Sequence, residues 1–320
     1  MPRSKHAPPR TAASAHARPA SHRPRKRFSQ HFLADAWARR VVAVIDPQPG
    51  DVFLEIGPGE GAITLPLAAS GAPVLAVEID RDLATALAAR VPANVSIMTG
   101  DFLKTDIVPF LTGLEPQSVL GGWEAGRPGG VEPLQASKSP SLPASTPPRR
   151  FRLVGNLPYH LSTPILFRLI DLHVREGLFT DATIMLQREV AERLAARPGT
   201  KAWGVLSIHL QLHADIALKL RLPPGAFHPA PKVDSAVVQL ALHPPRTRIV
   251  DFDLFERLVR IMFSHRRKTL SNALKSFDPG GGIVLALAKI DGRRRPETLD
   301  LSEIGRLVEL FAAAKRPSVL

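Results

Sequence analysis

Short apolar segments rich in β-branched residues alternate along this chain with helical patterns, and this alternation restricts the possible folds more than any other feature. Strands that alternate with helices build parallel sheets with helices on both faces. The sequence therefore predicts an α/β fold with a doubly wound parallel sheet. The expected strands are Val52–Ile56, Val74–Val77, Val95–Ile97, Phe151–Val154 and Thr183–Leu186, and helical patterns lie at about 62–70, 80–90, 162–174 and 188–197.

The segments that flank this sheet predict further elements. An amphipathic helix is expected over 32–45, ended by the DPQPG turn at 46–50. The apolar runs Gly204–Leu212 and Ser235–Leu240 have no helical pattern between them, so we expect an antiparallel pair of strands at one edge. After Pro245 the pattern becomes helical near 254–263, 266–275 and 302–314, which predicts a small helical domain.

A length of 320 residues suits a large domain with a smaller appendage. We expect a disordered basic arm at 1–24, a sheet domain at 25–243 and the helical domain at 244–320. The stretch 113–150 is dominated by Gly, Pro and Ser and has no periodicity. We interpret it as a surface insertion in the sheet domain, with a lid over the active site as the alternative.

The net charge of +13 is concentrated at the two ends of the chain. Residues 1–27 hold eight Lys/Arg and no acidic residue, and residues 221–320 hold 17 basic against 10 acidic ones, whereas the middle is nearly neutral. This distribution favours contact with a polyanion from two sides, although solvated charge without a partner is the alternative. A mitochondrial transit peptide at 1–24 is disfavoured because Pro8, Pro9, Pro19 and Pro24 interrupt the required helix.

Two absences narrow the class of protein. The chain has no cysteine, so disulfides, thiolate metal sites and a cysteine nucleophile are excluded. No apolar run approaches the roughly 18 residues of a membrane span. We therefore expect a cytoplasmic protein without a membrane partner.

The first predicted strand continues into the glycine-rich segment LEIGPGEG (54–61), which opens a predicted helix. Glycines at 57, 59 and 61 permit tight turns and the close approach of a ligand to the backbone. The G-x-G-x-G spacing is neither the dinucleotide fingerprint G-x-G-x-x-G nor a phosphate loop ending in Lys-Ser/Thr. Taken alone, the segment is equally compatible with an ordinary turn.

Two carboxylates strengthen the interpretation of this segment as a cofactor loop. Glu78 ends the second predicted strand, where a carboxylate can accept hydrogen bonds from both ribose hydroxyls. Asp101 follows the third strand, positioned to meet an adenine amino group. Because parallel strands end at one edge of a sheet, Gly57, Glu78 and Asp101 are expected in one crevice. Each carboxylate taken singly could instead be a helix cap or a solvated turn residue, and NAD is the competing cofactor.

The motif Asn156-Leu157-Pro158-Tyr159 follows the fourth predicted strand and decides against NAD. The exocyclic amine of adenine is a poor nucleophile because its lone pair is delocalised into the ring. The side-chain oxygen of Asn156 and the backbone carbonyl of Leu157 or Pro158 can accept both amino hydrogens and draw the nitrogen toward tetrahedral geometry. Tyr159, the chain's single tyrosine, can stack on the base. The motif therefore predicts methyl transfer to adenine, governed by positioning.

These segments resemble the ribosomal RNA adenine dimethyltransferases of the KsgA type from about residue 26 to about residue 276. The resemblance implies a class I S-adenosylmethionine-dependent methyltransferase with a Rossmann-like, doubly wound sheet and a small C-terminal helical domain. It rests, in the family's order, on KRFSQHFL (26–33), LEIGPGEG (54–61), VEID (77–80), GDFL (100–103), NLPYHLSTPIL (156–166), FHPAPKVDSAVV (227–238) and FSHRRKTL (263–270).

The resemblance also implies roles for single residues. Phe227 would face Tyr159 across a base taken out of its stack, with a core phenylalanine as the alternative. The cofactor would be S-adenosylmethionine, without a metal, contacted by His31, Leu33, Gly57, Glu78, Asp101 and Asn156. The basic cluster Arg266, Arg267 and Lys268 would contact RNA phosphates, with a solvated helix face as the alternative.

The opening segment departs from the family at two positions. His31 replaces the usual asparagine, and Ser29 stands where glycine is common. Because a histidine ring also donates and accepts hydrogen bonds, cofactor binding is expected to persist.

The substrate implied by the resemblance is a pair of adjacent adenosines in a hairpin near the 3′ end of 16S rRNA, within the immature small subunit. No obligate protein partner is implied. One alternative is the class that methylates large-subunit rRNA and confers macrolide resistance, but the PKVDSAVV and FSHRRKTL segments favour the small-subunit enzyme. Another is a non-catalytic ribosome assembly factor, which the intact NLPY motif disfavours.

Overall fold

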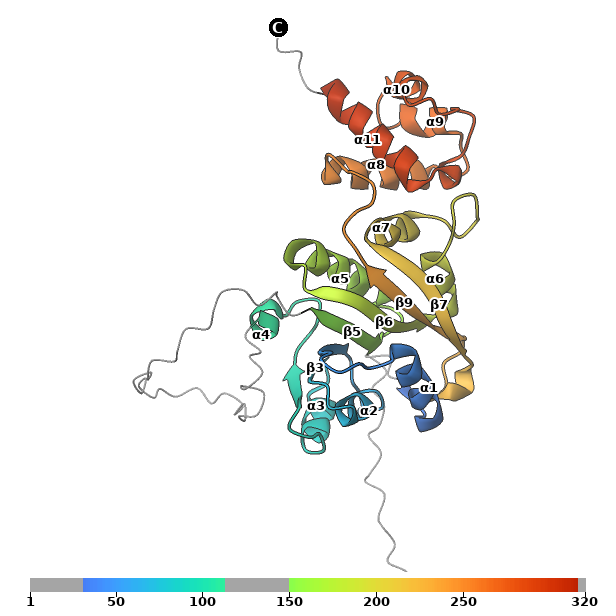
Figure 1. The fold of residues 1–320 in the computed structure, drawn as a ribbon. Helices are drawn as coiled ribbons and strands as arrows, with labels where there is room; N and C mark the ends of the chain where they lie inside the picture. The colour runs from blue at the N-terminus through green and yellow to red at the C-terminus, as the bar shows by residue number, and fades with distance from the viewer. Residues whose placement is uncertain (1–30, 113–149, 316–320) are drawn as a thin grey trace, which may run out of the picture.

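A computed structural model describes residues 31–112 and 150–315 of the protein (Figure 1). The predicted basic arm at 1–24, Ser29 and nearly all of the predicted insertion at 113–150 lie outside the described residues, so these predictions stay open. Within the described ranges the chain forms a helix-covered sheet, from which a cluster of C-terminal helices extends (Figure 1).

The central sheet has seven strands in the order β4-β3-β2-β5-β6-β9-β7. The first five in this order are parallel, whereas β9 is antiparallel to both β6 and β7. This is the predicted doubly wound sheet with an antiparallel edge. The strands are β2 (Phe53–Ile56), β3 (Val74–Glu78), β4 (Val95–Thr99), β5 (Phe151–Asn156), β6 (Phe179–Gln187), β7 (Ala214–Leu222) and β9 (Ser235–Leu242).

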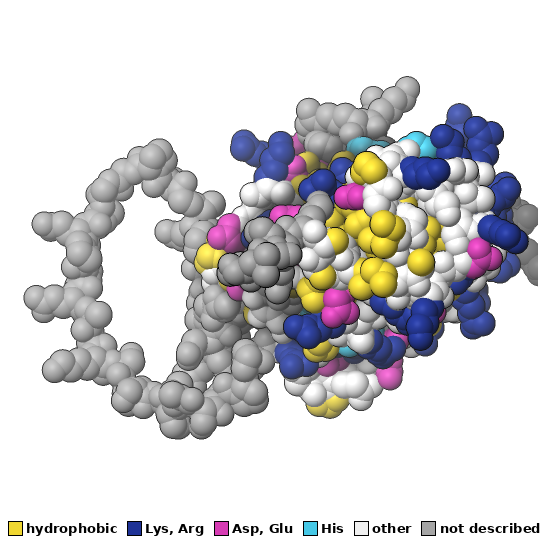
Figure 2. Space-filling view, turned by 90° about the horizontal axis from the view of Figure 1, so that it is seen from above, with side chains coloured by type: hydrophobic (Ala, Val, Ile, Leu, Met, Phe, Trp, Pro, Cys, Tyr) yellow, Lys and Arg dark blue, Asp and Glu magenta, His cyan; other side chains and the backbone are white. Residues whose placement is uncertain are grey.

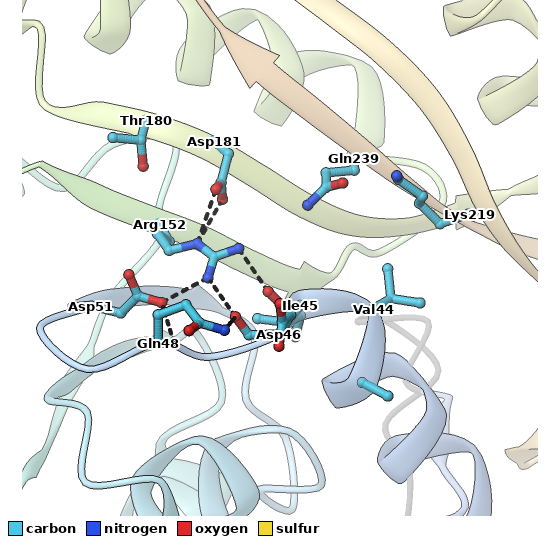
Figure 3. Close-up of a pocket in the computed structure, with 11 residues that line it drawn as sticks. Val44, Ile45, Asp46, Gln48, Asp51, Arg152, Thr180, Asp181, Lys219 and Gln239 are labelled. Carbon is cyan, nitrogen blue, oxygen red and sulfur yellow. Dashed lines mark hydrogen bonds and ion pairs between the residues drawn. The ribbon is translucent and has the colours of Figure 1, made fainter.

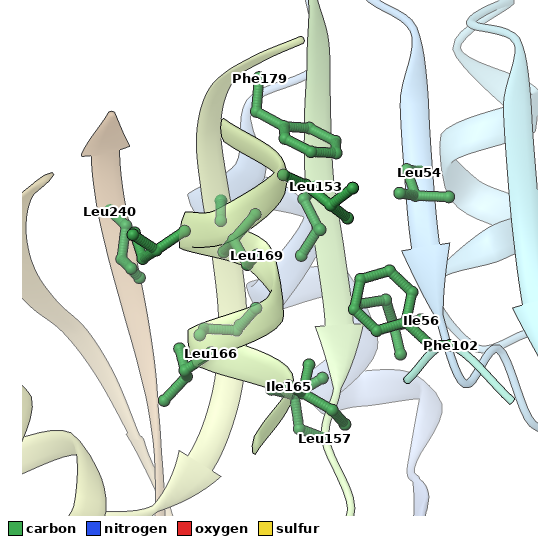
Figure 4. Close-up of a cluster of buried hydrophobic side chains, with 14 of the residues drawn as sticks. Leu54, Ile56, Phe102, Leu153, Leu157, Ile165, Leu166, Leu169, Phe179 and Leu240 are labelled. Carbon is green, nitrogen blue, oxygen red and sulfur yellow. The ribbon is translucent and has the colours of Figure 1, made fainter. Parts of the chain in front are cut away.

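Two hydrophobic clusters cover the two faces of the sheet. On one face α1 (Asp35–Ile45) and α2 (Thr64–Ala69) pack against Phe53 of β2. On the other face α5 (Ser162–Glu176) packs against Leu54 and Leu153 (Figure 4). Neighbouring residues of β2 thus point to opposite faces, as strand geometry requires. The remaining helices of this part are α3 (Arg81–Ala88), α4 (Val108–Thr112) and α6 (Arg188–Leu194).

The prediction of a strand at Gly204–Leu212 is wrong, because Val205–His213 form the helix α7. Leu206 and Leu210 of this helix pack into the cluster beside the sheet, while Ile208 and Leu212 pack into the core of the C-terminal helices. A helix buried on two faces is apolar all round and therefore lacks the amphipathic signal.

The strand that actually pairs with β9 at the sheet edge is β7, directly after α7. In β7, Ala214, Ile216, Leu218, Leu220 and Leu222 alternate with other residues, mostly polar ones. This period of two was the available signal for a strand.

The helices predicted after Pro245 are present, with altered bounds. The helix expected at 266–275 begins only at Leu270, and the helix α10 (Gly281–Leu287) was not predicted. The first predicted helix, expected from residue 32, begins only at Asp35. Residues 32–33 instead form the strand β1 (Phe32–Leu33), which pairs with β8 (Phe227–His228). The C-terminal helices are α8 (Phe252–Ser264), α9 (Leu270–Lys275), α10 (Gly281–Leu287) and α11 (Leu301–Lys315). No helix in the described ranges has both the length and the apolar character needed to cross a membrane.

Candidate active site

The predicted site residues gather at the carboxyl ends of the parallel strands. Gly57 follows β2, Glu78 ends β3, Asp101 lies two residues after β4, and Asn156 ends β5. β3 and β5 flank β2, and β4 flanks β3, so these positions share one edge of the sheet. Ligands bind at this edge in open α/β sheets.

The cofactor loop is a turn that requires glycine. Gly57, Gly59 and Gly61 have φ angles of +68°, +56° and +87°, in the left-handed region that other residues rarely adopt. A Cβ at Gly57 would be in ordinary van der Waals contact with the Asn156 backbone oxygen, at 3.9 Å, so the loop passes close to the end of β5.

Glu78 is the anchor of this loop. Its carboxylate accepts hydrogen bonds from the backbone N–H of Gly59 at 3.0 Å and of Asp80 at 2.9 Å. The side chain is buried, and this burial raises the pKa of Glu78, while the two backbone N–H groups oppose the rise. A carboxylate has about four lone-pair sites, so it can still accept hydroxyl hydrogens from a ribose.

Asp101 lies at the same edge in a more exposed position. Its carboxylate accepts a hydrogen bond from the Leu103 backbone N–H at 3.0 Å and lies 3.9 Å from the Lys104 Nζ. Its side chain is 29% exposed. An oxygen that faces solvent in this way can accept a hydrogen bond from an adenine amino group.

The opening segment lies against the cofactor loop. A Cβ at Gly59 would come within 3.2 Å of the Phe32 ring, which shows how closely this ring covers the loop. Leu33 pairs with Phe227, and its side chain is buried in the core, so a contact of Leu33 with a cofactor would use its backbone.

Asn156 is held in one orientation by the opening segment. Its Nδ2 donates a hydrogen bond to the His31 backbone oxygen at 2.9 Å. This bond uses one of the two amide hydrogens and sets the orientation of the amide, in which the side-chain oxygen can accept a hydrogen bond from a substrate. This is the polarity that acceptance of an amino hydrogen requires.

The two carbonyls proposed as a second acceptor differ in this structure. The carbonyl oxygen of Pro158 already accepts hydrogen bonds from the Leu161 N–H at 2.9 Å and the Ser162 hydroxyl at 3.1 Å. Leu157 donates its own N–H to the Met185 carbonyl at 3.2 Å. The Leu157 carbonyl is consequently the better candidate.

Tyr159 is fixed at both ends of its side chain. Its hydroxyl shares a 2.6 Å hydrogen bond with the fully buried Ser235 Oγ. Its ring stacks on the His31 imidazole, with centroids 5.6 Å apart and planes inclined by 25°. The His31 ring is itself held by a 2.7 Å hydrogen bond between Nδ1 and the Pro229 carbonyl. Burial raises the pKa of the Tyr159 phenol, and the bond to Ser235 opposes this rise.

The side chain of Phe227 is buried, so it does not present an exposed aromatic face in this structure. It is 4% exposed and packs in the core with Leu33 and Ala226. The aromatic ring that contacts Tyr159 in the described structure is His31. A role of Phe227 in gripping a base therefore stays a prediction.

The basic cluster after α8 is divided in its use. Arg266 donates hydrogen bonds to the backbone oxygens of Thr200 and Lys201 and lies 3.9 Å from Glu297, so it braces the 197–201 turn. Arg267 and Lys268 are exposed. Figure 2 shows exposed hydrophobic side chains on the face of the molecule formed by the C-terminal helices, and Lys and Arg side chains lie around them. The cluster can offer at least two exposed cations to a polyanion.

A cleft of about 610 Å³ lies at the opposite ends of the parallel strands, where they begin, beside Arg152 near the start of β5 (Figure 3). The Arg152 guanidinium bonds the carboxylates of Asp51 and Asp181 and the backbone oxygens of Ile45 and Asp46. Because each of its three nitrogens already donates a hydrogen bond, this arginine holds α1, β2, β5 and β6 together.

Two contributors to the site were not predicted as such. Ser235 lies within the quoted PKVDSAVV segment, and its position next to a buried strand was the available signal. Pro229 contributes only a backbone carbonyl, for which the sequence carries no signal.

Comparison with known proteins agrees with this geometry. Residues 21–313 match the family model described as ribosomal RNA adenine dimethylase. The chain is 41% identical to ribosomal RNA small subunit methyltransferase A of Syntrophotalea carbinolica, over 91% of this chain and 98% of the relative. It is 40% identical to the protein of the same name from Geobacter sulfurreducens, over 91% of this chain and 96% of the relative.

Solved structures show the same fold. A dimethyladenosine transferase from Plasmodium falciparum superposes with a TM-score of 0.63 and 23% identity, covering 88% of this chain and 98% of that one. The 23S rRNA methyltransferase ErmE superposes with a TM-score of 0.57 and 22% identity, covering 88% and 99%. The predicted class of sheet, with its C-terminal helices, is thereby confirmed. The family-model match and the relatives at about 40% identity show that the chain belongs to the ribosomal RNA adenine dimethylase family.

Proposed function

We propose that the protein transfers methyl groups from S-adenosylmethionine to the N6 atoms of two adjacent adenosines in a hairpin near the 3′ end of 16S rRNA. The product is dimethyladenosine, formed in the immature small subunit during ribosome biogenesis. The observation that carries this proposal is the hydrogen bond from Asn156 Nδ2 to the His31 carbonyl, because it leaves the amide oxygen for an amino group. Family membership and the names of the relatives support the same reaction.

The residues at the sheet edge fit S-adenosylmethionine. The positive φ angles of the loop and the position of Glu78 and Asp101 at the same strand ends support this fit. Glu78 would hold its ribose hydroxyls, Asp101 its adenine amino group, and the backbone at 31–33 would cover it. When bound, the cofactor supplies an electrophilic methyl group on a positively charged sulfur.

The protein's contribution to the reaction is the orientation of the acceptor base. The Asn156 Oδ1 and the Leu157 carbonyl would accept the two hydrogens of the adenine amino group. These bonds direct the nitrogen lone pair out of conjugation with the ring. A strong general base is not required, because the proton can leave after the nitrogen has gained a methyl group and a positive charge. Rate enhancement then comes mainly from holding the reacting atoms in line.

Tyr159 would form a stacking surface for the target base. Base–aromatic stacking contributes about 1–3 kcal/mol. The bond to Ser235 and the contact with His31 fix the plane of the ring before the base arrives. A base taken out of its stack therefore meets a surface that needs little rearrangement.

RNA binding would use the exposed cations of the basic cluster, Arg267 and Lys268. Each phosphate contact makes affinity depend on salt. Arg267→Ala is expected to weaken RNA binding and reduce the salt slope by about one unit. Lys275→Ala, which removes another exposed cation from the same domain, is the matched comparison.

The decisive test is methyl transfer from labelled S-adenosylmethionine to unmethylated small subunits and, separately, to large-subunit RNA. Dimethyladenosine at two adjacent small-subunit positions is the expected result. Label only in large-subunit RNA would move the protein to the resistance class. Asn156→Ala should bind small subunits normally and transfer no methyl groups, while Asn272→Ala, an exposed asparagine on α9, should behave as wild type. Binding without any transfer by the wild-type protein would indicate an assembly factor.

A further inference from the structure

The carboxyl group of Glu55 is buried beneath the cofactor loop, and the proposed reaction gives it no part. It lies on β2, two residues before Gly57, and is 2% exposed. Its Oε2 has no hydrogen-bond partner. A buried polar atom without a partner is costly, so its presence calls for an explanation.

A second buried carboxyl, that of Glu78, lies on the same side of the sheet. Glu55 is in register with Ala76 of β3, and Glu78 follows two residues later, so alternation places both side chains on one face. Among residues 31–112 and 150–315, no Lys, Arg or His forms an ion pair with either carboxyl. The floor of the cofactor loop therefore carries acidic groups without a neutralising cation from these ranges.

Such an arrangement favours a proton on one of the two groups when the site is empty. Burial raises the pKa of Glu55 to about 7; a contact with the Thr64 side chain opposes the rise, and the Glu78 carboxylate adds to it. A cation placed nearby acts in the opposite direction, because it stabilises the ionised form. A ligand with a positive charge would therefore displace the proton, and a neutral ligand would not.

We propose that Glu55 is a specificity-determining residue that loses its proton when the sulfonium-bearing methyl donor binds, so that its carboxylate favours the donor over the neutral thioether product. This inference rests on the proposed function, because only that reaction presents to one site a donor with a sulfonium charge and a product without it. The consequence for turnover is that transfer of the methyl group removes the charge that Glu55 recognises. Product release is thereby favoured.

The expected size follows from proton linkage. With a pKa of about 7, Glu55 is protonated in about nine molecules of ten at pH 6 and in about one of ten at pH 8. The donor must displace this proton, so its affinity for wild-type protein should weaken by up to about tenfold between pH 8 and pH 6. Affinity for the thioether product should change much less. The donor's own ammonium group also titrates, so the comparison that counts is between wild type and a variant.

Isothermal titration calorimetry of the full chain with S-adenosylmethionine and with S-adenosylhomocysteine, at pH 6, 7 and 8, tests the inference. Measurements in two buffers of different ionisation enthalpy count the protons released. Wild type should release about half a proton more per donor at pH 7 than Glu55→Gln does. Its preference for donor over product should rise severalfold from pH 6 to pH 8 and stay flat in Glu55→Gln. Glu176→Gln, which changes an exposed carboxyl at the end of α5, should match wild type.

A measurement on wild-type protein removes dependence on the folding of the variant. In protein with ¹³C-labelled glutamate carboxyls, one resonance should titrate near pH 7, and donor but not product should shift it to the ionised position. Equal pH dependence and proton release in wild type and Glu55→Gln would overturn this inference but leave the proposed function standing. Failure of wild-type protein to bind the donor at all would overturn the proposed function and this inference together.

Discussion

Replacing Ser235 by alanine tests whether one buried hydrogen bond holds the stacking surface in place. The bond joins the Tyr159 hydroxyl to Ser235 Oγ at 2.6 Å. In Ser235→Ala the half-buried phenol loses this partner. The net value of a hydrogen bond is about 1 kcal/mol, and an unsatisfied buried group costs about 1–3 kcal/mol. Because Tyr159 is only half-buried, we expect the free energy of unfolding to fall by about 1–2 kcal/mol.

A double-mutant cycle separates this bond from other effects of the substitution. Tyr159→Phe removes the same bond from the other side, so the second substitution should cost less once the first is present. We expect a coupling free energy of about 1 kcal/mol, measured by urea unfolding followed by circular dichroism. Ser276→Ala, at an exposed serine beside α9, should leave stability unchanged.

Tyr159 is the single tyrosine of the chain, so its phenol can be titrated directly by absorbance. Burial raises the pKa of this phenol and the bond to Ser235 opposes the rise. The pKa should therefore rise further in Ser235→Ala. Methylation of small subunits should slow about threefold to tenfold, because part of the 1–3 kcal/mol of base stacking depends on the plane of the ring. Cofactor affinity should not change. Strictly additive free energies, or an equal loss of cofactor affinity, would refute this account of Tyr159.

Three further substitutions test other parts of the structure. Arg152→Met should lower the free energy of unfolding by about 2–4 kcal/mol in urea, because it leaves the carboxylates of Asp51 and Asp181 without a cation; a loss below about 1 kcal/mol would contradict the bracing role. Gly59→Ala should weaken calorimetric binding of S-adenosylmethionine about tenfold, since the loop has φ +56° and the new methyl would press on Phe32; unchanged affinity would show that the loop can move. Burial, and then neighbouring histidines, lower the pKa of His213 to about 4. Because this value lies below the unfolded value of about 6.5, the unfolded chain binds more protons than the folded one. The free energy of unfolding should therefore fall by roughly 2–3 kcal/mol as the pH drops from 6.5 to 4. His213→Gln should flatten this part of the curve of melting temperature against pH, and an unchanged slope would assign the acid sensitivity to other groups.

The strand ends of the site were predictable because the rule behind them is local. Apolar runs locate the strands, and parallel strands end at one edge, so Gly57, Glu78, Asp101 and Asn156 could be brought together from their spacing alone. The polarity of the Asn156 amide could not. It depends on the His31 carbonyl, which is 125 residues away in the sequence and comes from the backbone.

The environment of Tyr159 was unpredictable for a related reason. Ser235 and Pro229 reach it because β8 and β9 return beside β1 and β6. The sequence indicates that the segment 227–238 contributes to the site, but it does not show that Ser235 bonds the Tyr159 hydroxyl or that the Pro229 carbonyl bonds His31. Charge patterning also failed to separate Arg266, which bonds two backbone carbonyls, from its exposed neighbour Arg267.

The double packing of α7 has a consequence for anyone who wishes to cut this protein or exchange its parts. The natural place to divide the chain by sequence is the linker after β9, near residue 244. Trp203, Ile208 and Leu212 nevertheless belong to the core of the C-terminal helices, although they precede that point. A truncation after residue 243 would uncover them, and a transplanted helical domain would arrive without part of its interior. A chimera that folds should carry residues 196–213 from the same parent as the C-terminal helices, and the two parts should unfold as one cooperative unit.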